Sequence, residues 1–145
     1  MRPGTWNFIC WLEAPHPRRK RKRAYVRVLV YPTAKAMKDA CRGLNATNNW
    51  ELPNTDDWDA RFVVFKDAGK KGGELGLVFL TRTHGAGVVA HEMCHVAWAW
   101  LTRHRSKLGE PDDERLAYLV QLLVGQYWSQ HKRECDWKRP SKASD

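Results

Sequence analysis

The sequence lacks any hydrophobic run that approaches the roughly 20 residues a helix needs to cross a bilayer. Residues 1–6 carry one charged side chain, with no apolar run of signal-peptide length behind it. No internal repeat, low-complexity segment or long Pro/Gly/Ser linker divides the chain. Because 145 residues is an ordinary length for one domain, we expect a single soluble, cytoplasmic domain spanning residues 1–145.

Cysteine is scarce and widely spaced. The four thiols are Cys10, Cys41, Cys94 and Cys135, and no two of them form a CxxC pair. Small secreted domains that depend on disulfides have a much higher cysteine density. An even count would permit two bridges, but nothing in the spacing favours them, so we expect reduced thiols.

Acidic residues are fewer than basic ones, 16 against 25, which leaves a formal net charge of +9. Much of the excess lies in one unbroken run, composed of Arg18, Arg19, Lys20, Arg21, Lys22 and Arg23. A run of this kind can contact nucleic acid or an acidic protein partner, and it can equally be a solvated loop between two strands. The sequence leaves both interpretations open.

Four segments rich in β-branched and aromatic residues predict strands. They are Trp6–Leu12, Tyr25–Tyr31, Arg61–Lys66 and Leu75–Leu80. The first two should pair antiparallel around the basic loop 15–24, and the last two should form a hairpin around a glycine-containing turn.

Three segments with apolar residues at spacings of three and four predict helices. They are Ala34–Leu44, about Gly87–His104 and Asp112–His131, and the polar tail 136–145 is expected to be loose. The strands precede the two principal helices. This order predicts an α+β fold, a small and mostly antiparallel sheet packed with an active-site helix and a following C-terminal helix.

The strongest chemical signal is the HExxH motif at residues 91–95. On a helix, His91 and His95 lie on one face and can reach the same metal ion, and Glu92 can address a water beside it. Zinc lowers the pKa of a bound water to about 7, and a nearby carboxylate can take its proton during attack on a carbonyl. The motif therefore predicts Zn²⁺ as cofactor and hydrolysis of peptide bonds as the reaction.

Catalytic zinc usually has three protein ligands and one open position. Glu114 is the preferred third ligand, because it lies 19 residues after His95 in the first turn of the next predicted helix. Acidic residues at a helix start are also common as partners of the helix dipole. The alternatives are Glu110, Asp112, Asp113 and, on the basic end of the helix that carries the motif, His104.

These residues resemble the HExxH zincins, and more narrowly the gluzincin pattern, in which a glutamate on a second helix completes the zinc site. The segment Asp113–Tyr118 looks like that second-helix motif and is similar to short phage and prophage peptidase-like proteins. The resemblance implies His91 and His95 as zinc ligands, Glu92 as general base and Glu114 as third ligand.

The active-site helix, with Trp98 close behind the motif, also looks like that of the SprT-like proteases, which cut proteins crosslinked to DNA. That family carries a histidine-glycine third-ligand motif further on, and Thr102–Asp113 contains no counterpart. The likeness to zincins covers residues 88 to about 128, under a third of the chain.

Two further roles are expected around the site. In zincins the strand before the active-site helix offers its edge to an extended substrate, and Leu75–Leu80 holds that position in the chain order. Tyr118 follows Glu114 by four residues and could donate a hydrogen bond to a developing oxyanion. The ordinary alternatives are a strand paired on both sides and a half-buried core tyrosine.

The sequence thus predicts a compact zinc metallopeptidase with Glu92 and Tyr118 as catalytic residues. The competing hypothesis is a basic module that binds nucleic acid or an acidic partner and contains a structural or inactive HExxH site. The run from Arg18 to Arg23 is compatible with either hypothesis.

Overall fold

A computed structural model describes residues 4–13, 22–48, 60–66, 73–103 and 113–137. Within these ranges the chain forms four strands and three helices. In chain order they are β1 (Trp6–Trp11), β2 (Tyr25–Tyr31), α1 (Ala34–Asn48), β3 (Arg61–Val64), β4 (Glu74–Thr81), α2 (Ala86–Arg103) and α4 (Asp113–Trp137). None of the helices in these ranges is both long enough and apolar enough to span a membrane.

The strands form one mixed sheet in the order β1-β2-β4-β3. Both predicted antiparallel pairs are confirmed, since β1 pairs with β2 and β3 pairs with β4. The central pair, β2 with β4, is parallel, because the chain passes through α1 and β3 before it returns beside β2. The expected α+β class is therefore confirmed, with a parallel pair at the centre of the sheet.

One row of side chains shows how the register builds the core. Phe8 pairs with Val28, Val28 pairs with Val78, and Val78 pairs with Phe62, so the four side chains project from the same face. Val28 and Val78 are fully buried, and the two phenylalanines pack against the same cluster from the outer strands. The row therefore runs across the sheet beneath the helices.

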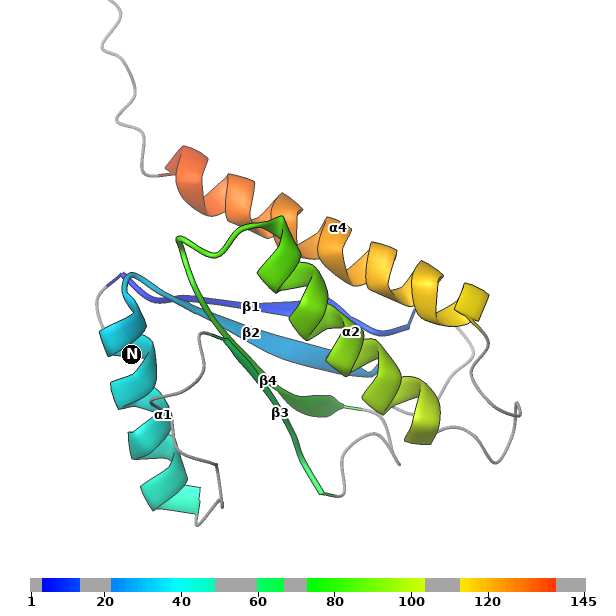
Figure 1. Cartoon of the computed structure of the whole chain (residues 1–145), viewed down its shortest axis with the longest axis horizontal. Coiled ribbons are helices and arrows are strands. Elements are labelled where there is room, and N and C mark those ends of the chain that lie inside the picture. Colours follow the sequence, from blue (N-terminus) through cyan, green and yellow to red (C-terminus); the bar gives the residue numbers. More distant parts are fainter. Residues whose placement is uncertain (1–3, 14–21, 49–59, 67–72, 104–112, 138–145) are drawn as a thin grey trace, which may run out of the picture.

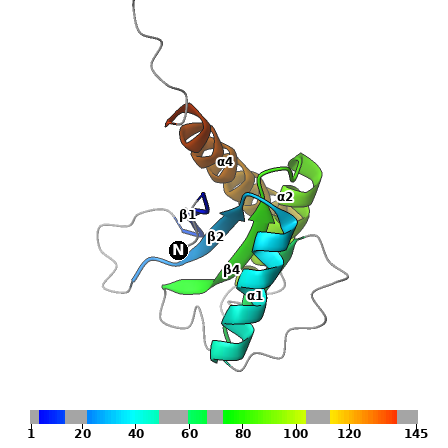
Figure 2. The same cartoon turned by 90° about the vertical axis from the view of Figure 1, so that its left-hand side faces the viewer.

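The helices cover opposite faces of the sheet (Figures 1 and 2). α2 and α4 pack together on the face of Val28 and Val78, and they bury Met93 and Leu123 there. α1 packs on the other face of β2 and β4, against a smaller cluster that includes Phe79. The sheet thus separates α1 from the helix that carries the HExxH motif.

The ends of the helices are close to the predicted ones. Thr33 caps α1 as expected, since its hydroxyl accepts a 3.1 Å hydrogen bond from the backbone N–H of Ala36. α4 continues to Trp137 and so includes the first two residues of the predicted loose tail. Long-range packing holds the helix where the predicted segment ends, because the ring of Trp6 lies 5.1 Å from that of His131 in an edge-to-face contact.

The four cysteines all lie in the described ranges and all are free. Cys10 and Cys41 are buried, and burial raises the pKa of each thiol to about 12. Cys94 and Cys135 are exposed on α2 and α4. The expectation that no disulfide staples this domain is confirmed.

Tyr127 offers a direct test of the core. Its ring is fully buried, and its hydroxyl has no hydrogen-bond partner among the residues that the structure describes. A buried hydroxyl without a partner costs about 1–3 kcal/mol. We therefore expect Tyr127→Phe to raise the free energy of unfolding by about 1 kcal/mol in urea denaturation at neutral pH.

The matched control is Tyr118→Phe, which removes the same hydroxyl from a side chain that is 68% exposed. This change should leave the urea midpoint where it is, because water replaces the lost contacts. A clear loss of stability in Tyr127→Phe would contradict the interpretation and would mean that the hydroxyl has a partner in the folded protein.

Candidate metal centre

The two motif histidines converge on a single point. His91 and His95 are one turn apart on α2, and their Nε2 atoms lie 3.1 Å from each other. Two nitrogens bound to one tetrahedral zinc at 2.0–2.1 Å would be about 3.3 Å apart. The same separation suits a hydrogen bond between the two rings. Both imidazoles are exposed, so the pair fits two ligands of one ion that is open to solvent.

The opposite side of α2 holds the helix in place. Its buried apolar residues are Val89, Met93, Val96, Ala97 and Trp100, all of which join the larger core cluster. Their spacings of three and four place them together on the sheet-facing side of the helix. The histidines therefore project from a helix whose position is determined by core packing.

Glu92 occupies a different environment from its neighbours. Only 6% of the residue is exposed, and this burial raises the pKa of its carboxyl group. His95, His91, a hydrogen bond from the backbone N–H of Phe62, and Arg61 lower the pKa and oppose that effect. The carboxyl group is therefore held between the histidines and β3.

The strand beside the site is β3, which corrects the expectation for Leu75–Leu80. β4 is paired on both sides, with β2 and with β3, so it has no free edge to offer. The backbone N–H of Phe65 donates to Leu75 O. Because backbone groups alternate in direction along an antiparallel strand, those of Phe62 and Val64 point away from β4.

A cleft of about 460 Å³ lies between α2 and the start of β3. It is lined by Ala60, Arg61, Phe62, His91, Glu92, His95 and Ala99. A second hollow of about 390 Å³ shares Ala60, His91 and Glu92 and continues toward the start of α2. The motif thus lies in a continuous depression within the size range of small-molecule and peptide sites.

The structure does not bring Glu114 to the histidines. Glu114 is exposed in the first turn of α4, and the described ranges contain no group of three His, Cys, Asp or Glu side chains that could hold a metal. α4 packs on the Cys94 side of α2, where Leu116 and Val120 line a shared groove with that thiol. The role of Glu114 as a ligand remains a prediction.

The other predicted partners are also away from the cleft or outside the described ranges. Tyr118 is exposed on α4 and does not line the hollows beside His91. Asp113 begins α4. Glu110, Asp112 and His104 lie outside the described ranges.

Arg61 and Phe62 are the site residues that sequence reasoning missed. They lie 29 or more residues before the motif in the chain, in a short strand that the sequence predicts only as half of a hairpin. Their relation to Glu92 depends on β3 being the strand nearest α2 in the sheet. No local pattern in the sequence carries that information.

Most of the basic run lies outside the described ranges, and Lys22 and Arg23 are the part within them. Arg23 donates from its Nε atom to the carbonyl of Glu13 at 2.5 Å, and its guanidinium lies 4.1 Å from the centre of the Trp11 ring. These contacts tie the end of the run to the β1–β2 hairpin.

Comparison with known proteins adds no relative from which a function could be carried over. Neither models of protein families, nor curated protein sequences, nor solved structures gave a match. Any assignment of function therefore depends on the chemistry of His91, Glu92 and His95 and on the cleft between α2 and β3.

Proposed function

We propose that this protein is a zinc-dependent peptidase whose site is the cleft between α2 and β3. The observation that carries the proposal is the 3.1 Å separation of the His91 and His95 Nε2 atoms beside a buried carboxyl group. Metal-assisted hydrolysis requires ligands for the metal and a base beside it. The two imidazole nitrogens at that spacing can supply ligands, and the adjacent Glu92 carboxylate can supply the base.

The residues present fit such an ion at two of its ligand positions. His91 and His95 would hold it through Nε2, and Glu114, which the described structure does not place beside them, is the third ligand that the sequence predicts. When bound, zinc supplies a Lewis acid that polarises a carbonyl and lowers the pKa of water. Glu92 can accept a proton from the attacking water and pass it to the leaving amine nitrogen.

The substrate would be an extended peptide lying along β3. The outward backbone groups of Val64 can pair with such a peptide, as in strand addition, while the N–H of Phe62 is already bonded to Glu92. The main chain would supply most of this binding, so we expect broad tolerance of substrate side chains at these positions.

Metal content is the first test. We expect about one zinc per chain in protein purified without added metal, and a zinc affinity lower by at least about 100-fold in His91→Ala and His95→Ala, because each change removes a direct ligand. Elemental analysis and competition with a chelator measure both quantities. Native protein that contains no zinc and takes up none on titration would contradict the proposal.

Two more variants identify the third ligand. Glu114→Ala should lose zinc if Glu114 completes the site, whereas His104→Ala should keep it. Loss of zinc in His104→Ala with retention in Glu114→Ala would identify His104 as the third ligand instead. Retention of zinc by both variants would remove Glu114 and His104 together and leave the site to other donors.

A basic binding module is the second candidate, and the six-residue run from Arg18 to Arg23 favours it. Contacts between such a run and phosphates release counterions, so binding to DNA should weaken steeply with salt. Neutralising the run should remove that salt dependence. DNA binding that is unchanged by neutralisation, or absent from the native protein, would exclude a nucleic-acid role for the run.

A further inference from the structure

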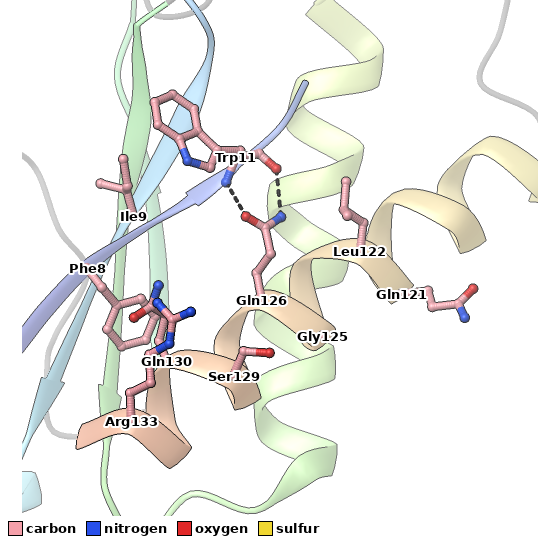
Figure 3. A pocket seen from close by; sticks show the side chains of 10 residues that line it. All are labelled: Phe8, Ile9, Trp11, Gln121, Leu122, Gly125, Gln126, Ser129, Gln130 and Arg133. Atoms are coloured by element: carbon pink, nitrogen blue, oxygen red, sulfur yellow. Dashed lines mark hydrogen bonds between the residues drawn. The ribbon is translucent and has the colours of Figure 1, made fainter. Parts of the chain in front are cut away.

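A second groove lies at the opposite edge of the sheet from β3, between the outer edge of β1 and the surface of α4 (Figure 3). Its volume is about 680 Å³. It is lined by Phe8, Ile9 and Trp11 from β1 and by Gln121, Leu122, Gly125, Gln126, Ser129, Gln130 and Arg133 from α4. None of these residues belongs to the proposed metal centre.

The side chain of Gln126 makes the pair of hydrogen bonds with the edge of β1 that a neighbouring strand would make. The backbone N–H of Trp11 donates to Gln126 Oε1 at 2.8 Å, and Gln126 Nε2 donates to Trp11 O at 2.9 Å. Figure 3 shows the amide reaching from α4 to both backbone groups. A side-chain amide has the same donor and acceptor as a peptide group, so the edge of β1 accepts a peptide-like partner at this position.

The next pair of outward backbone groups on the same edge belongs to Ile9. Leu12 N–H donates to Ala24 O, which directs the backbone of Leu12 toward β2 and that of Trp11 outward. Because the direction alternates along an antiparallel strand, the N–H and C=O of Ile9 also point outward. No described residue bonds to them, so Ile9 offers one donor and one acceptor to the groove.

The polar residues of α4 that line the groove recur at nearly the same spacing as the outward backbone groups of β1. The Phe8 and Tyr127 rings are 5.8 Å apart, and the Trp6 and His131 rings are 5.1 Å apart. Residue numbers therefore rise along α4 in the direction in which they fall along β1. Four helical residues rise about 6 Å, close to the roughly 6.8 Å between alternate strand residues. Gln130 therefore accompanies Ile9 along the groove as Gln126 accompanies Trp11.

The charge of the groove selects the occupant. Arg133 is the only charged residue among the described residues that line it, and it follows Gln130 by one helical turn (Figure 3). We propose that this groove binds an extended acidic peptide by strand addition at Ile9, with an acidic side chain of the peptide paired to Arg133. This binding is independent of the proposed peptidase activity.

The chain's own neighbouring segments do not match this chemistry. Residues 14–21, which follow β1, contain Arg18, Arg19, Lys20 and Arg21 and no acidic residue. Residues 138–145, which follow α4, contain three basic residues and only the terminal Asp145 as an acid. A basic segment beside Arg133 would be repelled, so neither of these two segments is the proposed occupant.

The test uses a fluorescein-labelled peptide of four Thr-Glu repeats, with fluorescence anisotropy measured on full-length protein carrying Glu92→Gln to prevent cleavage. Ile9→Pro removes the outward N–H, and proline is tolerated at such a position of an edge strand. We expect Ile9→Pro and Arg133→Glu each to weaken binding about tenfold, because one removes a backbone hydrogen bond and the other reverses a paired charge.

Ile9→Thr and Lys132→Glu are the matched controls. The first keeps the N–H, and the second reverses a charge one residue away that does not line the groove. Both should bind the peptide within about threefold of the parent, since each leaves the edge hydrogen bond and Arg133 in place. Peptides with Thr-Lys repeats, or with N-methyl groups on alternate residues, should bind at least about tenfold more weakly than the acidic peptide.

Three results would overturn the proposal. Equal binding of the acidic and basic peptides would remove the role of Arg133, and unchanged binding by Ile9→Pro with native circular dichroism would remove strand addition. A dimer in sedimentation velocity that Ile9→Pro dissolves would show that the edge serves a second copy of the chain.

Discussion

Glu92→Gln should leave the fold and the zinc content of the proposed site unchanged and lower the rate of the proposed peptidase reaction by about 10²–10⁴-fold. Glutamine has nearly the same shape as glutamate, and its side-chain carbonyl can still accept the hydrogen bond from Phe62 N–H. It cannot take a proton from water at neutral pH, so only the chemical step is lost. The measurement is the rate of release of labelled fragments from fluorescein-labelled casein.

The interpretation of that result depends on a matched glutamate. Glu134→Gln makes the same chemical change on α4, in a residue that does not line the cleft beside the histidines, and should keep full activity. Full activity in Glu92→Gln would show that Glu92 is not the base. A variant that lost zinc as well would show instead that this glutamate supports the metal site or the fold.

Gly76→Ala should destabilise the protein by about 1–3 kcal/mol and reduce its activity together with its stability. A Cβ atom at Gly76 would overlap the backbone carbonyl of Val63 and would lie 3.0 Å from Cε2 of Phe62. Both obstacles belong to β3, and one of them is rigid backbone. The strand would have to move outward, and its hydrogen bond to Glu92 would be lost.

Urea denaturation and the casein assay together test this expectation. Gly43→Ala is the control, because a Cβ atom there meets nothing within 4 Å and alanine favours the α1 helix. That control should gain up to about 1 kcal/mol of stability. An unchanged urea midpoint in Gly76→Ala would mean that β3 does not pack against β4 as closely as the structure indicates.

Local sequence signals account for most of the elements found. Thr33 identifies the start of α1 because its hydroxyl can satisfy a backbone N–H that the helix itself leaves open. The β1–β2 and β3–β4 pairs follow from strands joined by turns, which connect antiparallel neighbours at low cost in chain entropy. The convergence of His91 and His95 follows from the helical repeat alone.

Long-range packing accounts for what the sequence did not predict. The parallel pairing of β2 and β4 joins residues about 50 positions apart, as in Val28 with Val78, and no turn signal encodes it. That pairing leaves β3 at the edge of the sheet beside Glu92. It also places β4 between two strands, so β4 has no free edge for a substrate. A prediction from chain order alone therefore selected the wrong strand.

The sequence by itself determined the spacing of the motif histidines, the helix that presents them and the α+β class, because these depend on residue types and on periodicities of a few residues. Tertiary structure decided that β3 lies beside the histidines, that α4 lies on the Cys94 side of α2 and that Gln126 bonds to Trp11, 115 positions away. These relations depend on which apolar faces bury one another, and that choice is made by the whole core at once.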